Sequence, residues 1–142
     1  MPTIDSATTG DYYAAKNGVA VIDRSALGRL TMSGAEALDL LQRLSTQDLH
    51  MLSSGHGCLT VLTSEKGRVI DLLAVHHLGD HLLLVTSADN QVAVANWLEK
   101  YTIIEDSVTR DITSETALLA FFGAQARTLA DRLAGGHLET MA

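Results

Sequence analysis

An aspartate inside an apolar run is the side chain best placed to do chemistry. Asp71 stands between Ile70 and Leu72 in a segment that reads as a strand. A carboxylate held on a sheet in a water-poor cleft can accept a proton or stabilise positive charge on a bound ligand. The same residue can also be a hydrogen-bonded structural carboxylate, or can point to solvent from a half-exposed strand. The residues alone leave these interpretations open.

Six histidines and one cysteine raise the question of a metal or nucleophile. His76 and His77 are neighbours in a strand-like run, and successive side chains of a strand point to opposite faces, so the two cannot bind one ion without distortion. We therefore expect no metal site. Cys58 lies in an apolar run with no basic neighbour to lower the pKa of its thiol, and it is expected to be a small buried hydrophobe.

Composition narrows the class of protein. The chain has 142 residues, of which 46% are hydrophobic, and a formal net charge of −7. Scattered basic residues on an acidic chain do not supply the clustered charge that nucleic-acid binding needs, so we expect no nucleic-acid partner. No apolar run approaches the roughly 20 residues of a membrane helix. With no secretory signal at the start and a single cysteine, the sequence predicts a cytoplasmic protein without a membrane partner.

Hydrophobic periodicity predicts the elements that must position these residues. The predicted strands are Val19–Ile22, Leu27–Met32, Cys58–Thr63, Arg68–His77, His81–Thr86, Thr102–Ile104, Val108–Ile112 and Thr116–Phe122. The predicted helices are Asp11–Lys16, Ala35–Leu44, Asn90–Tyr101 and Ala124–Leu133. This order predicts an α+β fold, with helices packed on one face of a mainly antiparallel sheet.

Helix starts and buried stripes can also be read from the pattern. Ser33 with Glu36 three residues later has the form of a capping box for the second helix. Ser87 or Asp89 is expected to cap the third helix. The predicted buried stripe of that helix comprises Val92, Val94, Ala95, Trp97 and Leu98.

Several short motifs occur in an order that resembles a known family. The segment 62–71, LTSEKGRVID, is a strand, a loop and a second strand that ends in Gly-x-Val-Ile-Asp. The other motifs are Val21–Ser25, Ser33–Ala37, Leu41–Asp48, Gly79-Asp80, the Trp97 helix, Arg110-Asp111 and Phe122–Ala124. Over about Asp11–Leu133 the chain resembles the N-terminal, folate-binding region of the glycine-cleavage T-protein, or aminomethyltransferase, family. That family includes folate-dependent demethylases and a folate-binding iron–sulfur-assembly factor.

The resemblance implies a cofactor and a set of site residues. The cofactor and small-molecule partner would be tetrahydrofolate or a 5-substituted folate. Asp71 would be the catalytic residue beside the reactive nitrogens, and Asp71, Thr86 and Leu62 would bind the cofactor. The implied reaction is that of a transferase in one-carbon metabolism, which moves an aminomethyl or methyl group to folate.

Departures from the family pattern leave the activity open. Leu72 stands where family enzymes have a second acidic residue, and Thr86 stands where Asn is common. The resemblance also implies that residues 1–142 are one truncated folate-binding-type domain, with a core of about 11–134, that lacks the C-terminal half and barrel of longer relatives. A similar short domain in tRNA-modification GTPases pairs with a second copy, which implies a homodimer that rebuilds the site. The alternatives are an active aminomethyltransferase-like enzyme, a degenerate folate-binding module, and a non-catalytic dimerising structural or regulatory domain.

Overall fold

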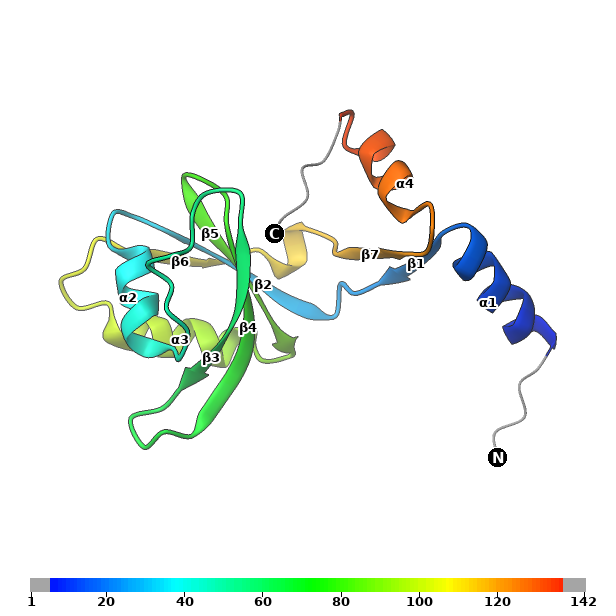
Figure 1. Cartoon of the computed structure of the whole chain (residues 1–142). Coiled ribbons are helices and arrows are strands. Elements are labelled where there is room, and N and C mark those ends of the chain that lie inside the picture. Colours follow the sequence, from blue (N-terminus) through cyan, green and yellow to red (C-terminus); the bar gives the residue numbers. More distant parts are fainter. Residues whose placement is uncertain (1–5, 137–142) are drawn as a thin grey trace. The chain divides into compact units, whose positions relative to one another are not determined.

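The computed structural model describes residues 6–136 and divides them into two compact units (Figure 1). The described part of the first unit comprises residues 6–24 and 118–136, and the second unit comprises residues 25–117. The expectation of a single domain over the whole chain stays a prediction.

The second unit is built on a five-stranded sheet. Its strands are β2 (Leu27–Ser33), β3 (Gly57–Thr63), β4 (Val69–His77), β5 (His81–Ala88) and β6 (Val108–Asp111). Their order across the sheet is β3-β4-β5-β2-β6, and every neighbouring pair is antiparallel. The predicted α+β class with a mainly antiparallel sheet is therefore confirmed. A short 3-10 helix, Thr113–Glu115, follows β6.

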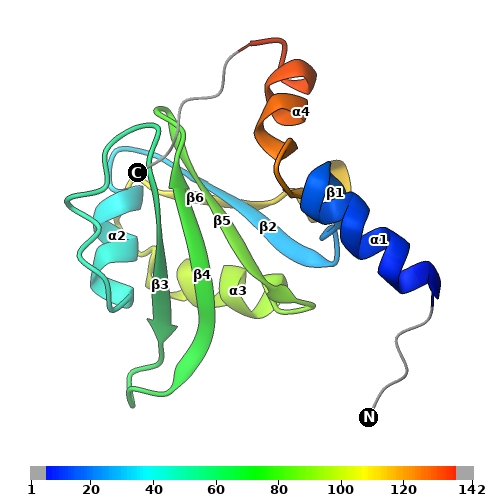
Figure 2. The ribbon, with the colours of Figure 1, turned by 45° about the vertical axis from the view of Figure 1, so that its right-hand side comes forward.

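Two helices cover one side of this sheet. They are α2 (Ala37–Leu44) and α3 (Gln91–Tyr101), and they lie on the same side of the strands (Figures 1 and 2). Alternate residues of the strands point toward them and form an aliphatic core, in which each fully buried Leu or Val contributes about 1.5–3 kcal/mol. The core comprises Leu30, Met32, Ala37, Leu40, Leu41, Leu49, Leu62, Leu73, Val75, Leu82, Leu84, Val94 and Leu98.

The first unit brings together residues from the two ends of the described chain. It contains α1 (Ser6–Asn17), β1 (Ala20–Asp23), β7 (Leu119–Phe122) and α4 (Ala126–Leu133). β1 pairs antiparallel with β7 along their whole lengths. Gly123 follows β7 at φ +117°, and a Cβ there would stand 2.2 Å from the carbonyl oxygen of Ala15, so this turn requires glycine.

Both predicted helix caps are wrong. Ser33 is the last residue of β2, and α2 begins at Ala37 without a side-chain cap. Instead of closing a capping box, Glu36 Oε2 accepts a hydrogen bond of 2.7 Å from the backbone N–H of Asp106. α3 likewise begins at Gln91 without a side-chain cap, because the Ser87 hydroxyl bonds elsewhere. The side chains of Glu36 and Ser87 thus bond to residues distant in the sequence rather than to a helix end.

Smaller errors concern element limits and one strand. Segment 102–104 is a loop, in which Ile104 is 91% exposed and its N–H donates to the Glu105 carboxylate. Val92 is exposed, so it does not belong to the buried stripe of α3. The structure extends the first helix back to Ser6 and shortens the last strand to Leu119–Phe122. The remaining predicted strands and helices are present, with ends that differ by up to two residues.

Candidate functional site

The structure brings the three predicted site residues together. Leu62 on β3 lies directly opposite Asp71 on β4, and Thr86 lies on the neighbouring strand β5. All three are buried, and the Asp71 residue is 4% exposed. Asp71 shares its sheet face with Leu73 and Val75, the face that α2 and α3 cover. A carboxyl group thus lies at one end of an aliphatic core.

Three hydrogen bonds hold the Asp71 carboxylate. The Ser87 hydroxyl donates to Oδ1 at 2.6 Å, and the Ser87 backbone N–H donates to Oδ2 at 3.0 Å. The backbone N–H of Leu72 also donates to Oδ1, at 2.8 Å. Because an ionised carboxylate has about four acceptor positions, these bonds leave one position on Oδ2 for another donor. Hydrogen bonds to both oxygens make the burial of this carboxylate tolerable.

Close packing surrounds Thr86. Its hydroxyl donates to the carbonyl oxygen of Ser87 at 2.9 Å. A Cβ built on Gly28 would stand 2.2 Å from Thr86 Oγ1 and 2.5 Å from Gln91 Cβ. Because glycine has no side chain, β2 can lie this close to β5 and to the start of α3. Asn90 Nδ2 donates to the carbonyl oxygen of Ile70 at 3.1 Å, which ties the start of α3 to β4. This end of the sheet is therefore closely packed around the carboxylate.

Sequence reasoning missed the residues that fix Asp71 in place. Ser87 was considered as a helix cap, although it provides two of the three hydrogen bonds to Asp71. No local pattern marks Gly28 or Asn90 either. The one available signal is the pair Thr86-Ser87 at the end of β5, the strand that neighbours the one carrying the buried Asp71. This signal can be recognised only after the order of the strands in the sheet is known. Leu72, which stands in the position of the family's second acid, points to the opposite face and is 53% exposed.

Among the described residues, the histidines and Cys58 form neither a metal site nor a thiolate site. Among residues 6–136, no group of three or more His, Cys, Asp and Glu side chains is arranged to hold a metal ion. Cys58 is half-buried, and its burial raises the pKa of the thiol, which disfavours the reactive thiolate. Within the described part of the chain no helix is long and apolar enough to cross a membrane. Asp71, Thr86 and Leu62 line none of five well-formed surface cavities among the described residues.

Comparisons with known proteins identify the family. The aminomethyltransferase of Synechococcus sp. (strain CC9902) is 32% identical over 144 residues, which cover 97% of this chain and 40% of that protein. The aminomethyltransferase of Thermotoga maritima is 29% identical and is covered to 39%. The chain thus spans about 40% of the length of these curated relatives.

Structure and family comparisons agree with this relationship. The crystal structure of the glycine cleavage system aminomethyltransferase T from Bartonella henselae has the same fold, with a TM-score of 0.78 and 23% identity. That match covers 89% of this chain and 35% of the other. The family model described as the GCVT N-terminal domain matches residues 2–141. The chain therefore belongs to the GCVT N-terminal domain family, and it is homologous to the N-terminal region of aminomethyltransferases.

Proposed function

We propose that the chain binds tetrahydrofolate, or a 5-substituted folate, at the end of the sheet where Asp71, Thr86 and Leu62 meet. Membership of the family supports the ligand class. The observation that carries the proposal is the Asp71 carboxylate, which is buried and held by Ser87 and Leu72 with one acceptor position to spare. These hydrogen bonds fix the orientation of the carboxylate before a ligand arrives.

The three residues suit different parts of such a ligand. The spare position on Asp71 Oδ2 would accept an N–H of the folate, and the low local dielectric would strengthen that bond. Thr86 already donates its hydroxyl proton to Ser87, so its oxygen can act toward a ligand as an acceptor. Leu62 would provide apolar contact. In one-carbon transfer to folate, the nitrogen that gains an aminomethyl or methyl group loses a proton, and Asp71 would accept it.

The open face of the five-stranded sheet supports a second proposal, a homodimer. Leu59 and Leu72, which are 62% and 53% exposed, lie on the face opposite α2 and α3, and half-buried Val61, Leu83 and Val85 continue the patch. Apolar patches of this kind mark interaction surfaces. We propose that a second copy covers this face, which lies on the other side of the sheet from Asp71.

A second candidate function, a non-catalytic dimerising module, is favoured by a specific observation. Ser87 and Leu72 occupy three of the four acceptor positions of the Asp71 carboxylate, and the exposed side chain beside it is Leu72 rather than an acid. In this case Asp71 would serve to join β4 to β5, and the open face would be the functional surface. The two candidates differ in whether folate binds.

Calorimetric titration with tetrahydrofolate and 5-formyltetrahydrofolate, with light scattering on the same sample, separates the candidates. Folate binding by a dimer at micromolar strength, about −8 kcal/mol, supports the folate site. Asp71→Asn should then weaken binding at least about tenfold, because it exchanges an acceptor for a donor. Asp11→Asn removes the same charge from an exposed position on α1 and should leave the affinity unchanged. A dimer that binds no folate at millimolar concentration supports the non-catalytic module, and a monomer at all concentrations rejects the homodimer.

A further inference from the structure

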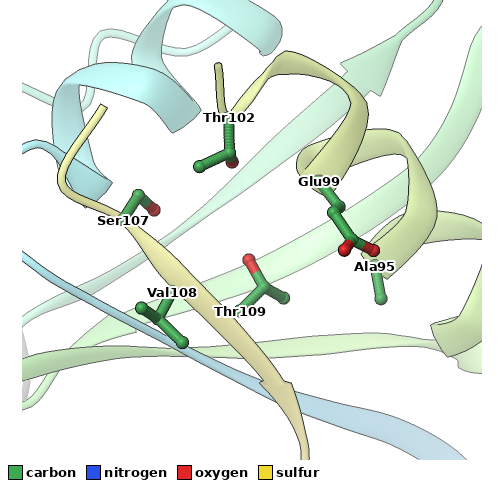
Figure 3. Close-up of a pocket in the computed structure, with 6 residues that line it drawn as sticks. All are labelled: Ala95, Glu99, Thr102, Ser107, Val108 and Thr109. Atoms are coloured by element: carbon green, nitrogen blue, oxygen red, sulfur yellow. The ribbon is translucent and has the colours of Figure 1, made fainter. Parts of the chain in front are cut away.

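A cavity between α3 and β6 has the chemistry of a second ligand site. Its volume is about 300 Å³, and it lies within the second unit. Its lining residues are Ala95, Glu99, Thr102, Ser107, Val108 and Thr109 (Figure 3). It shares no lining residue with the folate site proposed above, so the two sites can be tested separately.

Two hydroxyl groups in this cavity lack partners. Ser107 Oγ and Thr109 Oγ1 are buried and make no hydrogen bond to any of the described residues. Ser107 as a whole is 8% exposed. In Figure 3 both hydroxyl oxygens point into the space between α3 and β6. Buried polar groups are rarely left unpaired, so a partner that fills the cavity would relieve an unfavourable arrangement.

One charged side chain lines the same cavity. Glu99 is the charged residue among those that line the cavity; it is exposed, and its side chain extends from α3 beside Ala95 (Figure 3). The backbone carbonyl of Glu99 accepts a hydrogen bond from the Thr102 N–H. Its side-chain carboxylate takes part in none of the hydrogen bonds or ion pairs found among residues 6–136, and the adjacent Lys100 pairs with Glu65 instead. Thr102 Oγ1 donates to the carbonyl oxygen of Leu98 at 3.0 Å and can still accept a hydrogen bond. The cavity therefore combines one negative charge, one acceptor hydroxyl and two unpaired hydroxyls.

The geometry points to a small protonated amine that also carries a hydroxyl group, an amino alcohol. Its ammonium group would donate to the Glu99 carboxylate and to Thr102 Oγ1, and charge-assisted bonds of this kind are the strong ones. Its hydroxyl oxygen would accept from the hydroxyls of Ser107 and Thr109. An anion would be repelled by Glu99, and an apolar molecule would leave both buried hydroxyls unpaired. One carboxylate with hydroxyls falls short of the oxygen ligands that a divalent cation needs.

Three small probes of equal size test this assignment. Ethanolamine has the proposed groups, n-propylamine lacks the hydroxyl, and ethylene glycol lacks the charge. In an amide NMR titration of the whole chain, ethanolamine should give saturable shifts in segments 95–102 and 107–109, with millimolar affinity. The other two probes should bind about tenfold more weakly, because each loses one set of polar contacts. Equal responses to ethanolamine and ethylene glycol, or shifts that do not saturate below about 100 mM, would overturn the proposal.

Variants locate the binding. Glu99→Gln should weaken ethanolamine binding about tenfold, since it keeps the size of the side chain and removes the charge. Ser107→Ala should weaken ethanolamine binding but leave n-propylamine binding unchanged, because n-propylamine has no oxygen for Ser107. Asp11→Asn is the charge control on the other unit and should have no effect. Full ethanolamine affinity in Glu99→Gln, with an unchanged amide spectrum elsewhere, would reject the site.

Discussion

Ser87 donates two hydrogen bonds to Asp71, one from its hydroxyl and one from its backbone N–H. The backbone pairing of β4 with β5 runs from His77 to Ala74, so Asp71 lies beyond its end. The side chain of Asp71 therefore holds the two strands together where the ladder of backbone bonds has stopped. Asp71 therefore links β4 to β5 in addition to its proposed role in ligand binding.

Removal of the Ser87 hydroxyl tests how much its bond to Asp71 stabilises the fold. Ser87→Ala loses the bond of 2.6 Å to Oδ1 but keeps the backbone N–H bond. We expect the free energy of unfolding to fall by about 1–2 kcal/mol, because a hydrogen bond to a charged group is lost inside the core. Urea denaturation followed by the fluorescence of Trp97 measures it. An unchanged midpoint would show that the Ser87 hydroxyl does not hold the carboxylate in solution.

Arg29 is the most heavily bonded side chain of the second unit, and its replacement should be costly. The residue is buried, and all five of its N–H groups donate, to the carbonyl oxygens of Ser25, Leu27, Thr113 and Thr116 and to the Thr116 hydroxyl. Lysine has three donors and cannot reproduce this fork. We expect Arg29→Lys to lower the free energy of unfolding by about 2–4 kcal/mol, because several buried acceptors lose their donors.

A matched arginine provides the control for that experiment. Arg110 lies on the neighbouring strand β6 and pairs with Glu115 at the surface, where both side chains are more than half exposed. Arg110→Lys should change the free energy of unfolding by less than about 1 kcal/mol. Equal losses in both variants, measured by urea denaturation, would contradict the clamp role of Arg29.

Gly28 should not tolerate a methyl group. In Gly28→Ala the new Cβ would clash with Thr86 Oγ1 and Gln91 Cβ, and we expect a loss of about 1–3 kcal/mol from overpacking. Gly10→Ala, in open space on α1, is the control and should be neutral or slightly stabilising. Thermal unfolding measures both. A Gly28→Ala protein as stable as the parent would mean that β2 and β5 can separate at this end of the sheet.

Acid should remove one stabilising ion pair. Arg43 and the backbone N–H groups of Ile103 and Ile104 lower the pKa of Glu105 from 4.5 to about 2. The folded carboxyl thus releases its proton at lower pH than the unfolded one, so its stabilising effect is complete above about pH 4.5 and is lost as the pH falls toward 2. The melting temperature should fall less steeply over this range in Glu105→Gln than in the parent. Parallel pH profiles would refute the contribution of Glu105.

Alternation of apolar residues was sufficient to predict most of the sheet. Buried apolar residues occupy alternate positions of β2 (Leu30 and Met32) and of β5 (Leu82 and Leu84), because each strand has one face on the core. The same alternation gave no sign that Arg29 would be buried on the other face. Its acceptors lie partly at residues 113 and 116, and no local pattern reports a partner so far along the chain.

The site followed a similar course. Asp71, Thr86 and Leu62 came from a resemblance to a family. The structure places Leu62 opposite Asp71 and Thr86 on the neighbouring strand, with all three side chains on the buried face of the sheet. Ser87 was assigned to a helix start because serine before an amphipathic run is a common cap. In the structure the Ser87 hydroxyl instead donates to the buried carboxylate of Asp71, sixteen residues earlier in the chain. A hydrogen bond to a buried carboxylate is stronger than one to a helix end at the surface. Which of the two bonds Ser87 makes cannot be predicted before the pairing of the strands is known.

The pairing of β1 with β7 sets an order of events during protein synthesis. At about 5–20 residues per second, β1 leaves the ribosome several seconds before its partner β7 exists. Residues 25–117 can meanwhile form their own sheet and core, since they include all five of its strands. Val21 and Ile22 stay exposed on an unpaired strand through that interval, which is the period when a nascent chain is most open to wrong strand pairing. Of the two units, the one that contains β1 and β7 therefore starts to be synthesised before the other but is completed after it.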